Sequence, residues 1–194
     1  MYTVKRLEGS DAPRPARWLG ASEGNEGPIY VLERGDEVVW SVGIDFGRAS
    51  FVPFREELVW ESADAIVLGG GDTVYVLDIG TSALRATIAV PSRFGHLALA
   101  PVPTPDGGEE FLFVLGWTDV HAVDRRLETR WIARNVAVDG IVFHEIRGDA
   151  LIVSAEMDPP GGWVEVALDI RTGSELSRRS PSLPGPRSGT VHND

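Results

Sequence analysis

The chain has 194 residues, of which 43% are hydrophobic and 24% are charged, and such a chain can bury the core of a globular domain. Its formal net charge of −11 argues against binding to nucleic acid, because proteins that bind a phosphate backbone carry a basic stripe. The absence of cysteine excludes disulfides, and the lack of an apolar run of about 18 residues or of an apolar signal segment favours a cytoplasmic protein without a membrane span.

The first predicted repeat covers residues 1–44 and contains four short strands. They are expected at 2–7, 17–20 and 37–42, and a further strand leads into Glu33. These segments are rich in β-branched and aromatic residues and are bounded by Gly, Asp or Pro, which is typical of strands. No window of useful length has an apolar period of about 3.6 residues, so helices are expected to be absent or single turns.

Three further repeats, over residues 45–90, 91–135 and 136–180, show the same pattern. In each of them one strand leads into an aspartate, and these residues are Asp78, Asp124 and Asp169. The other strands are expected at 49–54, 65–69 and 83–89, at 96–100, 111–116 and 128–134, and at 141–146, 150–154 and 174–179. Residues 181–194 are rich in Pro, Gly and Ser and are expected to form a flexible C-terminal tail.

The acidic residues at the ends of these third strands recur at a nearly constant period. Glu33, Asp78, Asp124 and Asp169 are separated by 45, 46 and 45 residues. Four short antiparallel strands in a repeat of about 45 residues are the signature of a β-propeller blade. The sequence therefore predicts an all-β, propeller-like domain of four blades over residues 1–180, with closure within one chain preferred to completion by a second chain.

The turn in the fourth repeat carries a motif. Residues 168–173, Leu-Asp-Ile-Arg-Thr-Gly, resemble the turn of quinoprotein-like (PQQ-like) propeller repeats, and residues 77–81 are a looser copy. The resemblance, which extends to WD-like blades, implies a propeller and says little about activity. The tryptophan that usually closes such a repeat is present as Trp40 and Trp131. The aspartate of the turn has a structural interpretation, because its carboxylate accepts hydrogen bonds from backbone N–H groups of the following residues.

In a propeller whose first strands are innermost, the loops between second and third strands share a face with the loops between repeats. The first kind of loop carries an acid in every repeat, and these residues are Glu23, Glu26, Asp72, Asp119, Glu156 and Asp158. Turn chemistry is the favoured explanation, because Asp is an ordinary hairpin residue. The alternative is a calcium site, since calcium takes about six to eight oxygen ligands. Its candidate ligands are Asp72, Asp119, Glu156 and Asp158. No calcium motif supports such a site, so no cofactor is expected.

The same face also carries arginine and aromatic side chains, which are the usual anchors of protein recognition. Arg48 and Arg93 are 45 residues apart and occupy equivalent positions, where ion pairs between neighbouring blades are an equally good explanation. Trp117 and Trp163 lie close to the loops, where packing is the competing explanation. The predicted partner-binding residues are Glu23, Arg48, Asp72, Arg93, Trp117, Asp119 and Trp163.

These features favour a non-enzymatic binding module that recognises a protein partner, preferably a basic one, through its acidic loop face. An adaptor or a toxin-neutralising immunity protein fits the size and the charge. The alternative is a metal-dependent hydrolase or lactonase that uses the carboxylates of this face, so the question of enzymatic activity stays open. The sequence does not fix the oligomeric state.

Overall fold

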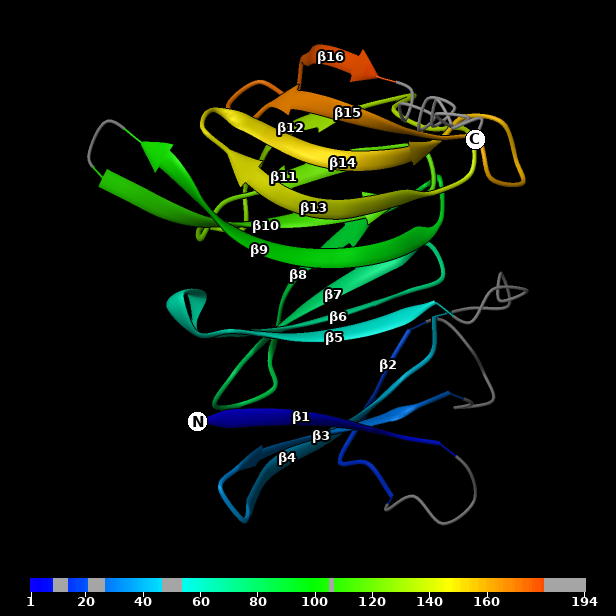
Figure 1. Ribbon diagram of the computed structural model, residues 1–194. Helices are drawn as coiled ribbons and strands as arrows, with labels where there is room; N and C mark the ends of the chain where they lie inside the picture. The colour runs from blue at the N-terminus through cyan, green and yellow to red at the C-terminus, as the bar shows by residue number, and fades with distance from the viewer. Residues whose placement is uncertain (9–13, 21–26, 47–53, 105–106, 180–194) are drawn as a thin grey trace, which may run out of the picture.

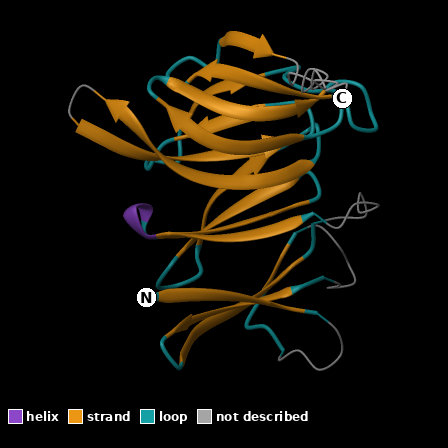
Figure 2. Ribbon diagram, viewed as in Figure 1, coloured by secondary structure: helices purple, strands orange, loops and turns teal. Residues whose placement is uncertain are grey.

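The computed structural model describes residues 1–8, 14–20, 27–46, 54–104 and 107–179. These residues form an almost entirely β structure, with four four-stranded sheets and one 3-10 turn, η1 (Glu61–Ala63) (Figure 2). The sheets follow one another along the chain as the blades of an arc (Figure 1). None of the described residues forms a helix long and apolar enough to cross a membrane. The prediction of an all-β protein with four four-stranded blades is confirmed.

The second, third and fourth sheets are antiparallel, and their strands pair in chain order. The second contains β5 (Arg55–Trp60), β6 (Ala65–Gly70), β7 (Thr73–Asp78) and β8 (Leu84–Ala89). The third contains β9 (Phe94–Thr104), β10 (Gly107–Gly116), β11 (Val120–Val123) and β12 (Thr129–Ala133). The fourth contains β13 (Ile141–Arg147), β14 (Ala150–Glu156), β15 (Trp163–Asp169) and β16 (Glu175–Arg179). The first strands of these three sheets, β5, β9 and β13, lie side by side (Figure 1).

Most of the strand predicted at 49–54 lies outside the described residues. Of that segment only Phe54 is described, and it belongs to no strand, whereas β5 spans Arg55–Trp60. The apolar character of residues 49–54 suggested a strand, whereas β5 begins with three charged residues. Those residues reach the neighbouring sheets, where Glu56 hydrogen-bonds His96 and Glu57 contacts Arg6. The charged start of β5 therefore contacts both neighbouring sheets.

The core lies between the sheets, in one apolar cluster for each pair of neighbouring sheets. Successive residues of a strand point to opposite faces, so each inner sheet contributes to two clusters. In β7, Val76 packs toward the third sheet and Leu77 packs toward the first, and both are fully buried. Burial of one such side chain contributes about 1.5–3 kcal/mol to stability, and this stacking holds the arc together.

Two tryptophans fasten neighbouring sheets by a side-chain hydrogen bond. Trp40 Nε1 donates to the carbonyl oxygen of Ile79 in the next sheet at 2.8 Å. Trp131 Nε1 donates to the carbonyl oxygen of Ile170 in the next sheet at 2.9 Å. Both indoles are buried, so these hydrogen bonds satisfy polar groups that would otherwise be costly to bury. The two tryptophans that the repeat pattern singled out thus occupy equivalent positions.

The repeated aspartates hold the turns between third and fourth strands. Asp78 Oδ1 accepts hydrogen bonds from Thr81 Oγ1 (2.8 Å) and Thr81 N (2.9 Å). Asp169 Oδ1 accepts them from Thr172 Oγ1 (3.0 Å) and Thr172 N (2.9 Å). The hydrogen bond from the threonine hydroxyl, together with those from the backbone, lowers the pKa of both aspartates. The structural interpretation of the motif is confirmed.

The first sheet departs from the predicted strand order. It consists of β1 (Tyr2–Leu7), β2 (Trp18–Leu19), β3 (Ile29–Arg34) and β4 (Glu37–Ile44) in the order β1-β3-β4-β2. The strand predicted at 17–20 was expected between β1 and β3, but β2 pairs in parallel with β4 on the outer edge. Trp18 packs against Gly43, where a Cβ atom would lie 2.5 Å from the indole ring. The missing side chain at Gly43 therefore makes room for this strand.

The register shows that Glu33 is not the counterpart of the repeated aspartates. Trp40 pairs with Leu32, whereas the equivalent tryptophan of the third sheet pairs with Ala122. Leu32 and Ala122 therefore match, and the residue two positions after each of them must match as well. That residue is Arg34 in the first sheet and Asp124, one of the repeated aspartates, in the third. The predicted alignment of the first repeat is wrong by one residue.

A tight turn explains why the first repeat has no such aspartate. Arg34 pairs with Glu37, which leaves a two-residue connection, and Gly35 takes the left-handed φ of +63° that such a turn needs. In the longer turns an aspartate accepts hydrogen bonds from N–H groups of the turn residues that follow it. The two-residue turn lacks these turn residues. Glu33 instead forms a 2.7 Å ion pair with Lys5 of β1.

The strand β1 takes the place of a second strand, not of an innermost one. Val4 pairs with Leu32, and Phe113 of β10 pairs with Ala122. Since Leu32 and Ala122 match, β1 matches β10. In the third sheet β9 lies on the inner side of β10, but no described residue pairs with β1 on that side. The described part of the first sheet therefore lacks the innermost strand that the prediction assigned to residues 2–7.

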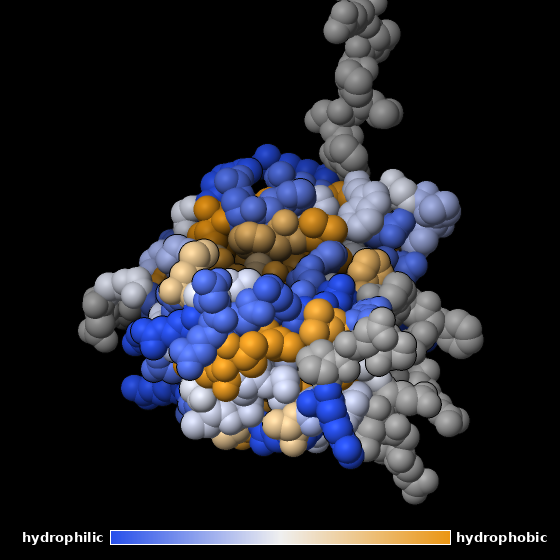
Figure 3. Space-filling model, turned by 90° about the horizontal axis from the view of Figure 1, so that it is seen from below, coloured by the Kyte–Doolittle hydropathy of each residue, from blue (hydrophilic) through white to orange (hydrophobic). Residues whose placement is uncertain are grey.

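The two ends of the arc carry polar side chains on part of their outward faces, beside apolar residues such as Ile29, Val31 and Ile152. The residues of the second sheet that face the first sheet include Ile66, Leu68 and Leu77, which are fully buried. The matching residues of the first sheet, which face away from the arc, are Thr3, Lys5 and Glu33. Figure 3 shows the molecule from this end, with hydrophilic side chains among apolar ones. At the other end the fourth sheet turns outward Ser154, Glu165 and Ser177. The sheets form an open arc, so the expected closure into a ring is wrong.

Candidate functional site

The loops between second and third strands and those between sheets gather on one side of the arc, at the right in Figure 1. A cleft of about 420 Å³ opens on this side. The residues that define this loop-face cleft are Phe54, His96, Trp117, Asp139, Glu156 and Trp163. Trp117 follows a second strand, whereas Asp139 lies between the third and fourth sheets. The structure therefore confirms that both kinds of loop share one face.

Gly140 brings the main elements of the cleft together. Its N–H donates to the carbonyl oxygen of Trp117 at 2.9 Å, and its carbonyl oxygen accepts from Glu156 N at 2.9 Å. Its φ of +143° is one that L side chains rarely adopt, and a Cβ atom there would lie 3.3 Å from Cη2 of Trp163. A glycine at this position therefore lets the backbone hold Trp117, Glu156 and Trp163 around one space.

Two carboxylates border the same cleft. Glu156 Oε1 accepts a hydrogen bond from Gly161 N at 2.6 Å, which fixes the side chain. Its other oxygen lies 3.8 Å from the position of a Cβ atom at Gly140, on the side of Trp163. Asp139 is exposed. Neither carboxylate forms an ion pair with any described side chain, so among the described residues the cleft places two carboxylates beside aromatic rings.

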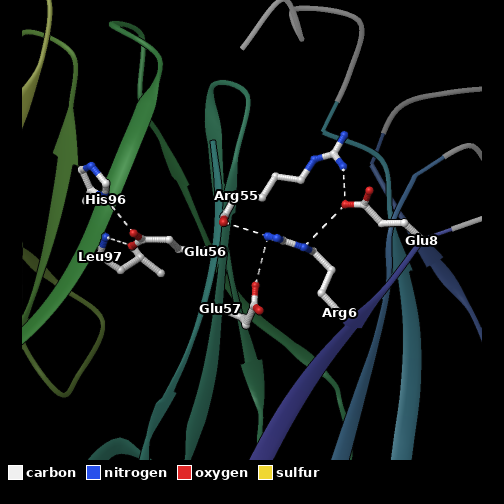
Figure 4. Close-up of polar contacts among 7 residues, drawn as sticks. All are labelled: Arg6, Glu8, Arg55, Glu56, Glu57, His96 and Leu97. Atoms are coloured by element: carbon white, nitrogen blue, oxygen red, sulfur yellow. Dashed lines mark hydrogen bonds and ion pairs between the residues drawn. The ribbon is translucent and has the colours of Figure 1, made fainter. Parts of the chain in front are cut away.

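His96 borders the cleft and contacts a carboxylate of the second sheet. Its Nδ1 lies 2.6 Å from Glu56 Oε1, and the other oxygen of Glu56 accepts from Leu97 N at 2.6 Å (Figure 4). The hydrogen bond to Glu56 raises the pKa of His96, and it outweighs the opposing effect of burial. The imidazole also packs against Phe54, with 5.9 Å between ring centroids. The polar contact of the imidazole is therefore with Glu56, and no such contact joins His96 to Glu156 or Asp139 among the described residues.

Arg93 covers one face of Trp117. Its guanidinium carbon lies 5.0 Å from the centroid of the indole, and its carbonyl oxygen accepts from Trp117 N at 3.0 Å. A cation placed over an exposed tryptophan contributes about 0.5–1 kcal/mol. Arg93, which the sequence placed on the partner-binding surface, thus contacts a loop of the neighbouring sheet and positions the indole.

The structure does not bring the four candidate metal ligands together. Asp72 and Asp158 are exposed in different loops, Glu156 borders the cleft and Asp119 is buried. Across residues 1–8, 14–20, 27–46, 54–104 and 107–179, no group of three or more His, Asp or Glu side chains is placed to hold a metal ion. The remaining predicted residues of this face, which lie outside the described residues, are Glu23, Glu26 and Arg48.

Asp119 is part of a buried polar cluster. Its carboxylate accepts a hydrogen bond from Ser92 Oγ and lies 3.1 Å from His121 Nε2, and its side chain is 5% exposed. Burial alone would raise the pKa of Asp119, but the hydrogen bonds from His121 and Ser92 outweigh it and hold the pKa below its usual value. Ser92 contacts the carboxylate and not the imidazole, so this is not the relay of a serine hydrolase. Asp119 joins two loops and is out of reach of a partner.

Two residues of the cleft, Phe54 and Gly140, were not predicted from the sequence. Phe54 was assigned to a strand, and nothing in the local pattern contradicts that assignment. Gly140 follows Asp139, and this Asp-Gly pair is a turn signal that marks the connection between the third and fourth sheets. His96 and Asp139 belong to the loops between repeats that the analysis placed on this face, but the sequence gives no sign that they border one cleft.

Comparison with known proteins identifies the fold but no family. No family model and no curated protein matches the chain. BamB from Moraxella catarrhalis is 16% identical in sequence, with a TM-score of 0.53 over 78% of this chain and 46% of that one. Hydrazine synthase from Kuenenia stuttgartiensis is 16% identical, with a TM-score of 0.56 over 89% of this chain and 50% of that one. The chain thus spans about half the length of both structures. It is a propeller-like repeat protein, as its repeats predict.

Proposed function

We propose that this protein is a non-enzymatic binding module that recognises a basic protein partner by taking an Arg or Lys side chain into the loop-face cleft. The observation that supports this proposal is the placement of Trp117 and Trp163 beside the carboxylates of Glu156 and Asp139, which form no ion pair with a described side chain. Aromatic faces and carboxylates both attract cations, so the two kinds of group select the same ligand. An adaptor or an immunity protein would be a narrower form of this function.

The energies of these contacts fit an anchor residue at a protein interface. A cation over an aromatic face contributes about 0.5–2 kcal/mol, and a hydrogen bond to a charged group contributes about 1.5–3 kcal/mol. Interfaces typically depend on a few such anchors in partly enclosed pockets, with tryptophan and arginine prominent among them. The net charge of −11 adds a long-range attraction that accelerates encounter with a basic partner.

We expect Glu156→Gln and Trp163→Ala each to weaken binding of a tri-arginine peptide by about tenfold. The glutamine retains an oxygen that can accept from Gly161, so the first variant removes the charge and leaves the loop in place. Isothermal titration calorimetry measures the affinity, and a tri-citrulline peptide of the same shape tests the need for positive charge. Equal binding of the two peptides would contradict the proposal.

Asp72→Asn is the matched control for this experiment. It also removes one exposed negative charge, but Asp72 does not border the cleft. Its effect on peptide binding should be less than about twofold, because a distant exposed charge is largely screened by salt. If Asp72→Asn and Glu156→Gln weaken binding equally, the attraction comes from the net charge and not from the cleft.

Chelation separates this proposal from the metal-dependent hydrolase. A metal bound only by the folded state raises the melting temperature, and its removal lowers it. We expect EDTA and added calcium to leave the melting temperature unchanged, as measured by differential scanning calorimetry. A drop with EDTA that one particular metal reverses would favour the hydrolase and would justify a screen for ester or lactone hydrolysis.

A further inference from the structure

The inner edge of β1 pairs with no strand among the described residues. One edge pairs with β3, from Tyr2 opposite Arg34 to Leu7 opposite Ile29. The other edge has no partner among the described residues, whereas the matching strand β10 is paired on both edges. An unpaired edge of this kind is a template for an additional strand.

The side chains of β1 are less covered than those of its counterpart. Tyr2 and Val4 are only partly buried against the second sheet. The matching residues of β10, Phe111 and Phe113, are 6% and 0% exposed beside β9. The first sheet therefore leaves apolar surface open at the position where the third sheet has its innermost strand.

A cleft marks the same position. It has a volume of about 680 Å³ and lies at the start of β1, beside the end of β5 and the middle of the third sheet. Tyr2, Val59 and Leu99 contribute apolar surface to it, and Glu61 and Glu110 contribute carboxylates. This space lies beside the start of β1, and none of the residues that line it also lines the loop-face cleft.

An ion-pair network holds the other end of β1 in a fixed position. Arg6 Nη1 donates to the carbonyl oxygen of Arg55 at 2.8 Å and lies 3.4 Å from Glu57 Oε2 (Figure 4). Arg55 Nη1 in turn lies 3.1 Å from Glu8 Oε1. These contacts tie β1 to β5, so an incoming strand would meet an edge that is already ordered. The entropy cost of ordering then falls mainly on the incoming strand.

We propose that the inner edge of β1 binds an extended segment of a partner polypeptide, which adds to the first sheet as its innermost strand. The segment runs antiparallel to β1, as β9 does to β10, and pairs with about six residues. Apolar side chains alternate along it, because Tyr2 and Val4 offer apolar contacts on one face. Its C-terminal end lies near Tyr2, where Glu61 and Glu110 favour a basic residue. This inference does not rest on the function of the loop-face cleft.

The test uses the peptide GHLALAR, which is the sequence of residues 95–100 of β9 followed by arginine. Apolar residues on both faces of this peptide allow it to pair in either register. We expect saturable binding, and amide hydrogen exchange measured by NMR should slow by at least about tenfold in β1. The outer edge strand β16 serves as the internal control, and its exchange should not change.

Two matched controls address the backbone and the charge. The peptide GHPAPAR lacks two N–H groups and should bind at least about tenfold more weakly. Glu110→Gln, which retains an acceptor for the 2.7 Å hydrogen bond from Ser62, should weaken GHLALAR but not GHLALA. Absence of binding, or binding without protection of β1, would overturn the proposal. If β1 is already protected in a dimer of the free protein, a second copy occupies the edge and the proposal of a partner segment is wrong.

Discussion

Replacement of Asp119 by alanine is expected to lower the free energy of unfolding by about 3 kcal/mol. The carboxylate is buried and contacts Ser92 and His121, so the substitution leaves two polar groups without their partner. Water cannot readily replace the carboxylate, because the side chains of both Asp119 and His121 are 5% exposed. Urea unfolding, followed by tryptophan fluorescence, measures the change.

The pH dependence of stability tests whether the ionised carboxylate of Asp119 is what stabilises the folded state. The pKa of Asp119 is lower in the folded state, so its charge stabilises the protein fully above the unfolded pKa of about 3.9 and loses this effect as the pH falls further. The difference in stability between the wild type and Asp119→Asn should therefore be constant near neutral pH and shrink below about pH 4. Asp72→Ala, which removes an exposed carboxylate, should cost less than about 0.5 kcal/mol. A similar cost for both alanine variants would contradict the structural role of Asp119.

The repeated part of the fold was predictable because its signals are local. The turns at Asp78 and Asp169 depend on a threonine three residues later, and both residues are visible in the sequence. The flanking strands are short, apolar and bounded by turn residues. The local sequence pattern was therefore enough to predict where the strands of the third and fourth sheets lie, and that each of these sheets has four strands.

The errors occur where pairing over a distance overrides the local pattern. The strand containing Trp18 looks like the second strand of a blade, but its contact with Gly43 places it at the outer edge. Glu33 looks like the repeated acid, but a two-residue turn at Gly35 shifts the register by one. The open arc is an arrangement of whole sheets, which a repeat period alone does not determine.

The sequence predicted which loops form the candidate site, but not which of their residues border the cleft. Trp117 and Trp163 were placed on the correct face, because strand order fixes which loops share a side. Whether a loop residue is exposed depends on residues far along the chain. Asp119 is buried, and its carboxylate accepts a hydrogen bond from Ser92, 27 residues earlier. Phe54 reaches the cleft beside His96, and no local pattern relates the two residues.

Conversion of the outward face of the first sheet to an apolar one is expected to make the protein self-associate. The triple variant Thr3→Ile, Lys5→Leu and Glu33→Leu gives this face the side chains that the second sheet carries at the matching positions. In the second sheet all three are fully buried against a neighbouring sheet. Burial of each contributes about 1.5–3 kcal/mol, so association with another copy becomes favourable. Sedimentation velocity over a series of protein concentrations should show larger species than the wild type forms.

The double variant Lys5→Gln and Glu33→Gln is the control, because it breaks the 2.7 Å ion pair but keeps the face polar. Lys5 is 55% exposed and Glu33 is 20% exposed, so the loss should be within about 1 kcal/mol and association should match the wild type. A triple variant that sediments like the wild type at every concentration would show that polarity is not what limits stacking. If only the triple variant associates, the polar side chains are what limits stacking. Both variants lose the ion pair, and only the triple variant gains apolar surface. The first sheet would then act as a cap, as polar terminal repeats do in stacked repeat proteins.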